Sequence, residues 1–138
     1  MKKKKFWLWL ALTVLWIGLI FWHSSCDSVQ SDRESLGLLF YIRKILPWMT
    51  NKLLRKLAHF GEFAILGLLL TGTCCNAKHF SLLAPLAFGL FTALCDETIQ
   101  LFVPGRSGNL RDLWIDFSGV VLGTLFLRLI FRLRNRTK

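Results

Sequence analysis

Four long apolar segments constrain the fold more than any other feature of this sequence. They cover roughly residues 6–22, 56–75, 80–103 and 112–131. A helix needs about 20 apolar residues to cross the hydrocarbon core of a bilayer, and each segment reaches or approaches that length. We therefore expect an all-α, multi-pass membrane protein with a bundle of four transmembrane helices.

The composition supports a membrane protein and argues against a soluble or nucleic-acid-binding one. Of the 138 residues 54% are hydrophobic, yet the formal net charge is +10. A soluble chain this short could not bury so much apolar surface in one core. The basic residues cluster at the ends of the apolar segments and form no stripe between surface aromatics. The expected partner is a lipid bilayer, and nucleic acid is excluded.

The first apolar segment is predicted to be a transmembrane helix. Lys2–Lys5 are followed by an uncharged run from Phe6 to Trp22. The alternative is a signal peptide, but the run is longer than a usual signal core and no A-x-A cleavage site follows. The next residues, His23–Cys26, also lack the leucine of a lipoprotein site.

The loops and charges predict a topology. Only Asn76–His79 separate the second and third segments, so these form an antiparallel hairpin, and Pro85 is expected to kink the third helix. With Lys2–Lys5 inside, ten lysines and arginines are cytoplasmic and eight are outside, as the positive-inside rule favours. All eight acids are then outside or in the outer half, and the net positive charge meets anionic headgroups. We expect a bacterial plasma-membrane protein with both termini cytoplasmic.

The first outer loop is predicted to contain a helix in the membrane interface. Ser31–Glu34, "SDRE", fits a capping box ahead of the apolar run "LGLLFYI". A partly inserted loop that covers the bundle is the alternative, and both stay open. The four cysteines have no metal-like spacing and fit small apolar residues of helices. A Cys26–Cys95 bridge is left open.

Polar residues of three segments are predicted to meet in one outer-leaflet layer. The second and fourth helices enter from outside and the third leaves towards it. This topology places the following residues at one level: Lys56, His59, Glu62, Asp96, Glu97, Gln100, Asp112 and Asp116. Charged groups in a membrane are costly unless they are paired, hydrated or functional, so the layer is a candidate site.

The helical faces agree with this convergence. On the fourth helix Asp112, Asp116, Gly119 and Gly123 fall within a stripe about 60° wide. Gly119 and Gly123 form a GxxxG pair that lets another helix approach closely. On the third helix Gly89, Ala93, Asp96 and Gln100 share a similar face, with Glu97 beside them. On the second helix Lys56, His59 and Phe63 are aligned, and Glu62 lies one step around. The acids therefore point into the bundle.

The connection "VPGRSGNLRD" joins the third and fourth segments. Pro104 and Gly105 are predicted to end one helix and turn the chain. Arg106 follows at the turn, where its planar guanidinium suits a carboxylate or a phosphate. Asn109 is predicted to cap the next helix, whose N-terminus also favours an anion.

These residues resemble the VanZ-like family of small bacterial membrane proteins. The similar stretches are "KLAHFGEF", "DETIQLFVPGR" and "RDLWIDFSGVVLG", and "IFWHSS" at the end of the first segment is also similar. The matching positions are Lys56, His59, Phe60, Glu62, Asp96, Glu97, Gln100, Arg106, Asp112, Asp116, Gly119 and Gly123. Arg55 replaces a common Asp, and Phe63 replaces a common Tyr, which argues against a mechanism that needs a phenol there. The resemblance implies one VanZ-like domain over residues 1–138. It also implies a cell-envelope role, with the family's namesake associated with resistance to the glycopeptide teicoplanin.

Three functions are compatible with the polar layer. We favour an envelope protein that binds an anionic lipid-linked or wall-precursor ligand, or a glycopeptide. Its ligand-binding residues would be Lys56, His59, Glu62, Asp96, Glu97, Gln100, Arg106, Asp112 and Asp116. An intramembrane acid/base enzyme is the second, with His59, Glu97 and Asp116 as catalytic candidates, but no serine or cysteine lies beside His59 to act as nucleophile.

The third function is a structural polar network with no ligand. Because no nucleophile lies beside His59, an enzyme is less favoured than a binding protein. No cofactor or metal is expected, although a metal held by His59 and carboxylates is a minor alternative. The oligomeric state is not predicted.

Overall fold

The structure is a computed structural model that describes residues 2–26, 28–77, 81, 83–106 and 108–136. These residues form five helices and no strand, in agreement with the predicted all-α class. The helices are α1 (Lys2–Ser25), α2 (Ser28–Ile42), α3 (Asn51–Asn76), α4 (Leu83–Leu101) and α5 (Leu110–Arg136).

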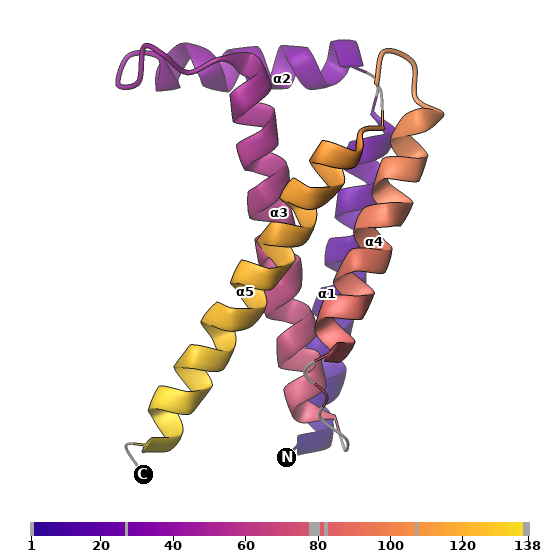
Figure 1. The fold of residues 1–138 in the computed structure, drawn as a ribbon, viewed down its shortest axis with the longest axis vertical. Coiled ribbons are helices and arrows are strands. Elements are labelled where there is room, and N and C mark those ends of the chain that lie inside the picture. Colours follow the sequence, from indigo (N-terminus) through magenta and orange to yellow (C-terminus); the bar gives the residue numbers. More distant parts are fainter. Residues whose placement is uncertain (1, 27, 78–80, 82, 107, 137–138) are drawn as a thin grey trace.

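Four of the helices form a bundle, and α2 lies across one end of it (Figure 1). Helix α3 contacts α1, α4 and α5, and crosses α5 near the middle of both helices. Helix α2 lies where α3 begins and α4 ends, and we call this the α2 end. Helix α1 begins and α5 ends at the opposite end (Figure 1). This layout brings the start of α3, the end of α4 and the start of α5 together.

Three of the described helices are long and apolar enough to cross a membrane. They are the segments Lys3–Ser25, Asn51–Asn76 and Leu110–Arg134 of α1, α3 and α5. Helix α4 falls outside this set because its last two turns carry Asp96, Glu97 and Gln100, which lower its hydropathy. Many large apolar side chains of the bundle are exposed, as expected for helices that contact lipid.

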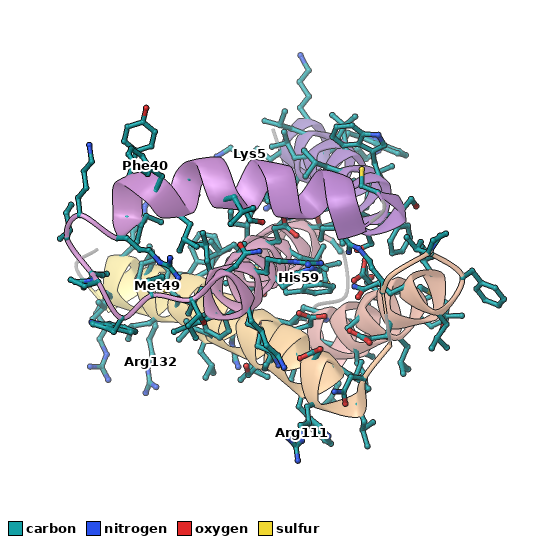
Figure 2. All side chains as sticks on the ribbon, turned by 90° about the horizontal axis from the view of Figure 1, so that it is seen from above. Lys5, Phe40, Met49, His59, Arg111 and Arg132 are labelled. Carbon is teal, nitrogen blue, oxygen red and sulfur yellow. The ribbon has the colours of Figure 1, made fainter. Side chains whose placement is uncertain are left out.

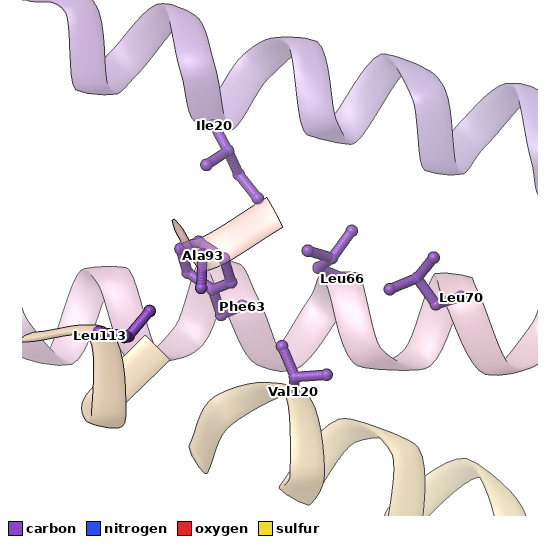
Figure 3. Close-up of a cluster of buried hydrophobic side chains, with 7 residues drawn as sticks. All are labelled: Ile20, Phe63, Leu66, Leu70, Ala93, Leu113 and Val120. Atoms are coloured by element: carbon purple, nitrogen blue, oxygen red, sulfur yellow. The ribbon is translucent and has the colours of Figure 1, made fainter. Parts of the chain in front are cut away.

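A small apolar core holds the bundle together below the α2 end (Figure 3). Its buried side chains are Ile20, Phe63, Leu66, Leu70, Ala93, Leu113 and Val120. They come from α1, α3, α4 and α5, so each of these helices is anchored to the others. Phe63 follows Glu62 directly, and Ala93 lies one turn before Asp96 and Glu97. The core thus fixes the positions of the polar residues next to it.

One local prediction was wrong, and another lies partly outside the described residues. Helix α2 begins at Ser28, so Ser31 is inside the helix and does not cap it; the side chains of the predicted capping box lie outside the described part of the structure. The predicted start of the third span at Phe80 is outside the described residues, and α4 begins at Leu83. Pro85 therefore lies in the first turn of the described helix, where proline is tolerated without a kink.

The cysteines form no disulfide. Cys26, Cys74, Cys75 and Cys95 are all free thiols of intermediate exposure. The Cys26–Cys95 bridge that the sequence left open is therefore absent from the structure.

Candidate functional site

A cavity of about 460 Å³ opens at the α2 end between α3, α4 and α5. Its lining residues are Asn51, Lys52, Arg55, Lys56, His59, Glu97, Gln100, Gly105, Arg106, Asp112, Ile115 and Asp116. We call this cavity the polar pocket. In the view from this end, His59 points into the space between the helices, next to several carboxylate oxygens (Figure 2). Seven of the nine predicted ligand-binding residues line the pocket; Glu62 and Asp96 do not.

The start of α3 is fixed by a cap. Thr50 has extended backbone geometry, and its hydroxyl accepts a hydrogen bond from the Leu53 N–H at 3.2 Å. This bond satisfies one of the N–H groups left without partners at a helix start. The cap sets the helix so that Lys56 and His59, in its first turns, face the pocket.

The turn between α4 and α5 is shaped by Gly105, Asn109 and Glu97. Gly105 has a φ of 74°, a left-handed conformation that favours glycine, and it reverses the chain after Pro104 as predicted. The Asn109 side chain accepts a hydrogen bond from the Arg111 N–H at 3.1 Å, so it caps α5 as predicted. The Asn109 N–H donates to Glu97 Oε2 at 2.7 Å. Glu97 therefore joins the end of α4 to the start of α5.

An ion pair crosses the pocket near its opening. Lys56 Nζ donates to Asp112 Oδ1 at 2.5 Å, which links α3 to α5. Both side chains are about one-third exposed. Ion pairs in such wet positions contribute only about 0–1 kcal/mol to stability. The ion pair therefore contributes little to the stability of the α3–α5 contact, and its main effect is to fix the positions of these two charges.

Two buried carboxylates lie near His59. His59 Nδ1 is 3.9 Å from Asp116 Oδ1. Asp96 Oδ2 accepts a hydrogen bond from Gln100 Nε2 at 2.9 Å. Asp96 and Asp116 are 0% and 1% exposed, and one oxygen of each, with one of Glu97, has no hydrogen-bond partner in the described part of the chain. The acids that line the pocket or lie beside it are therefore buried and incompletely satisfied.

Glu62 takes a different position from the other predicted residues. Its Oε1 lies 2.9 Å from His23 Nδ1 of α1, and its carbonyl accepts a hydrogen bond from Trp16 Nε1 at 2.9 Å. Glu62 therefore fastens α1 to α3 beside the pocket and does not line it.

Sequence reasoning missed the contribution of α1. The His23 ring stacks on the His59 ring at 6.2 Å between centroids, and the His23 carbonyl accepts a hydrogen bond from Arg106 Nη2 at 3.2 Å. The buried Ser24 lies beside Asp96. A second cavity of about 180 Å³ between α2 and α3 is also lined by His23, His59 and Arg106. The signal for these residues was the stretch "IFWHSS", noted for its similarity but given no role.

Gly119 and Gly123 let α5 approach α3 closely. A side chain at Gly119 would meet the Phe60 carbonyl, and one at Gly123 would meet the Ala64 carbonyl. Backbone atoms cannot move aside as a side-chain tip can, so glycine is required at both positions. This approach is what brings Asp112 and Asp116, one to three turns earlier on α5, against the face of α3 that carries Lys56 and His59.

The charges of the pocket are divided between its opening and its inner wall. Lys52, Arg55, Lys56 and Arg106 are the basic lining residues. Burial, and then the nearby positive charge of Arg55, lower the pKa of the Arg106 guanidinium from its ordinary value. A bound anion would favour the charged form of such a group. The basic side of the pocket is therefore suited to an anionic ligand.

A family comparison covers the whole of this arrangement. Residues 9–132 match the family model described as VanZ/LLP1. The chain belongs to the VanZ family. No curated protein and no solved structure gives a significant match. The matched range runs from α1 to α5, so every residue of the polar pocket is part of the VanZ domain.

The chemistry available to this VanZ-family pocket follows from its groups. Lysine and arginine can bind phosphate or carboxylate, and Arg106 can do so with two parallel hydrogen bonds. His59 and Asp116 can exchange a proton after a small movement, because 3.9 Å is just beyond hydrogen-bond distance. The pocket can therefore bind an anion, and it holds one acid/base pair.

Proposed function

We propose that this VanZ-family membrane protein binds an anionic group of a lipid-linked or wall-precursor ligand in its polar pocket. The observation that carries the proposal is the cavity itself. It has about 460 Å³ of space, basic residues at its opening and acids on its inner wall. That volume is in the usual range for small-molecule sites, about 300–1,000 Å³. Through this binding, the protein would serve the cell envelope and contribute to resistance to glycopeptides such as teicoplanin.

The membrane placement that we propose has four spans, with α4 as the third, in the bacterial plasma membrane. Both termini are cytoplasmic, and α2 lies in the outer interface. Support comes from the layout of Figure 1, in which α2 lies crosswise at one end while α1 begins and α5 ends at the other. Exposed Leu36, Leu38 and Phe40 on α2 give it an apolar surface that suits an interface. The pocket then faces the side on which wall precursors are assembled into the cell wall.

Ligand binding is tested on the full chain in lipid nanodiscs. A lipid-linked wall precursor or teicoplanin should raise the Tm of the wild type, because a ligand that binds only the folded state stabilises it. Lys56→Met and Arg106→Gln should stay folded but lose this rise, since each removes a basic group of the pocket. Arg111→Gln is the matched control, because Arg111 is exposed and does not line the pocket. Equal Tm shifts in all variants, or no shift in the wild type, would refute the proposal.

The role in resistance is tested in cells. A deletion strain should become more susceptible to teicoplanin, and the wild-type gene should restore its resistance. His59→Gln, Glu97→Gln and Arg106→Gln should fail to restore it at matched protein levels in the membrane. If their loss instead follows a loss of protein level or Tm, the polar residues serve only as a structural network.

One observation favours a second candidate function, an intramembrane hydrolase. His59 and Asp116 lie 3.9 Å apart at the pocket and can act as acid and base on water. Purified protein would then turn over a lipid precursor, and Asp116→Asn would stop turnover while sparing the ligand-induced rise in Tm. Binding without turnover selects the first function.

A further inference from the structure

The cluster of His59, Asp96 and Asp116 has the composition of a metal site. These residues come from three different helices, α3, α4 and α5, and the fold brings them together beside the polar pocket, which His59 and Asp116 line and Asp96 does not. We propose that they bind a divalent transition-metal ion. This site goes beyond the anion binding proposed above and stands on its own geometry.

The distances suit a metal site that is nearly formed. One ligand atom from each residue lies within 4.8 Å of the other two. The measured pair, His59 Nδ1 and Asp116 Oδ1, is 3.9 Å apart. Two ligands with metal bonds of about 2.1 Å can be at most about 4.2 Å apart. Side-chain movements of less than about 1 Å therefore suffice to bring all three ligands onto one ion.

Burial and charge point to a cation at this place. Asp96 and Asp116 are 0% and 1% exposed, yet neither Asp96 Oδ1 nor Asp116 Oδ2 has a hydrogen bond of good geometry among the described residues, although the Ser24 hydroxyl lies beside Asp96. The ion pair found for these two carboxylates among the described residues is the 3.9 Å contact of Asp116 with His59. Buried charges in proteins are normally paired or coordinate a metal. A divalent cation would satisfy both orphan oxygens and both charges.

The ligand types narrow the choice of metal. Imidazole nitrogen favours zinc and other transition metals over Mg²⁺ and Ca²⁺, and carboxylates are compatible with zinc and manganese. Three protein ligands leave at least one coordination position open, as in catalytic zinc sites. His59 and Asp116 both line the polar pocket, so the open position would face it.

A supporting interaction orients one ligand. Gln100 Nε2 donates to Asp96 Oδ2 at 2.9 Å, which leaves Asp96 Oδ1 available. Hydrogen bonds of this kind hold the ligands of known metal sites in position. A metal here would also add positive charge next to the basic residues of the pocket and so attract an anion.

The test measures metal content directly. The full chain is purified in detergent, stripped with EDTA, incubated with Zn²⁺ or Mn²⁺, desalted and analysed by mass spectrometry for metals. We expect about one ion per wild-type chain, as for a single three-ligand site. Asp96→Asn, Asp116→Asn and His59→Gln should retain less than about one-tenth of that amount.

Two control variants remove nearby groups that are not ligands. His23→Gln removes the histidine stacked on His59, and Asp112→Asn removes the pocket carboxylate that pairs with Lys56. Both should keep the wild-type metal content. Loss of metal in these two variants as well would show that the loss does not report on removal of ligands, and retention of metal in the three ligand variants would show non-specific binding; either result would overturn the proposal.

A second measurement does not depend on the variants folding. Zn²⁺ should raise the Tm of the stripped wild type, and Co²⁺ should give visible absorption bands typical of coordination by nitrogen and oxygen. If stripped wild type takes up no ion and its Tm does not respond, the carboxylates share a proton instead and the metal site is refuted. Neither measurement uses a lipid, so metal binding and anion binding succeed or fail separately.

Discussion

At the scale of single residues, Asn109 connects the end of one helix to the start of the next. Its side chain accepts a hydrogen bond from the Arg111 N–H, and its own N–H donates to Glu97 Oε2. The first bond satisfies an N–H group at the start of α5, and the second gives a buried carboxylate a partner. Asn109 therefore stabilises both α5 and the polar pocket, although it does not line the pocket.

Asn109→Ala should destabilise the protein by about 1 kcal/mol, the usual cost of losing a side-chain cap. For a chain of this size the Tm should fall by about 3 °C, measured by thermal unfolding in detergent. The N–H bond to Glu97 survives the substitution, so ligand-induced stabilisation should remain. Thr98→Ala is the control, because its exposed hydroxyl donates to the Leu94 carbonyl of the same helix. An equal Tm for both variants would contradict the capping role.

Sequence reasoning recovered those pocket residues whose position follows from helical periodicity. Lys56 and His59 share one face of α3, Asp112 and Asp116 share one face of α5, and a topology of antiparallel spans brings these faces to one level. His23 could not be found in this way, because it lies in the last turn of a helix whose charged residues, Lys2–Lys5, are all at the other end. Only the packing of α1 against α3, visible in the His23–Glu62 contact, brings it to His59.

At the scale of helices, the close crossing of α3 and α5 positions the pocket. Gly119 and Gly123 face the carbonyls of Phe60 and Ala64, and Gly67 of α3 faces the backbone of Val120 in return. Glycines on both helices thus let the two backbones touch. The GxxxG spacing predicted a close approach by some helix, but the sequence alone did not say that the partner would be α3.

Gly123→Ala should reduce stability by about 1–3 kcal/mol, the usual cost of overpacking a tight contact. The added methyl group would collide with the Ala64 carbonyl and push the helices apart. Gly61→Ala is the matched control on α3, because a side chain there meets nothing within 4 Å. Replacing glycine in an open helical position should stabilise by about 0.5–1 kcal/mol. Thermal unfolding of both variants in detergent checks the opposite signs; if Gly123→Ala is as stable as the wild type, the contact is not tight.

Helix boundaries were less predictable than helix faces. The sequence "SDRE" fits a helix start at Ser31, but the helix continues back to Ser28 and no cap is needed there. For α4, the apolar run begins before Leu83, yet Pro85 lacks an N–H and fits best within the first turn. Apolar length therefore predicts that a helix exists, whereas local hydrogen bonding decides where it starts.

At the scale of the whole molecule, the bundle has two different ends. The α2 end contains the polar pocket and Cys26, which follows α1 directly. The opposite end contains Cys74 and Cys75 in the last turn of α3, together with the basic residues of the end of α5. Because the free thiols lie at opposite ends, the protein carries its own reporters of membrane orientation.

Labelling of single-cysteine variants tests the proposed orientation. In intact cells a membrane-impermeant maleimide should label a variant that keeps only Cys26, because the α2 end faces outward. A variant that keeps only Cys75 should be labelled after permeabilisation alone, since its end faces the cytoplasm. Both thiols are partly exposed, so burial does not explain a difference between them. The reverse pattern would place the polar pocket in the cytoplasm, away from external glycopeptides, and would refute the proposed role at the outer surface.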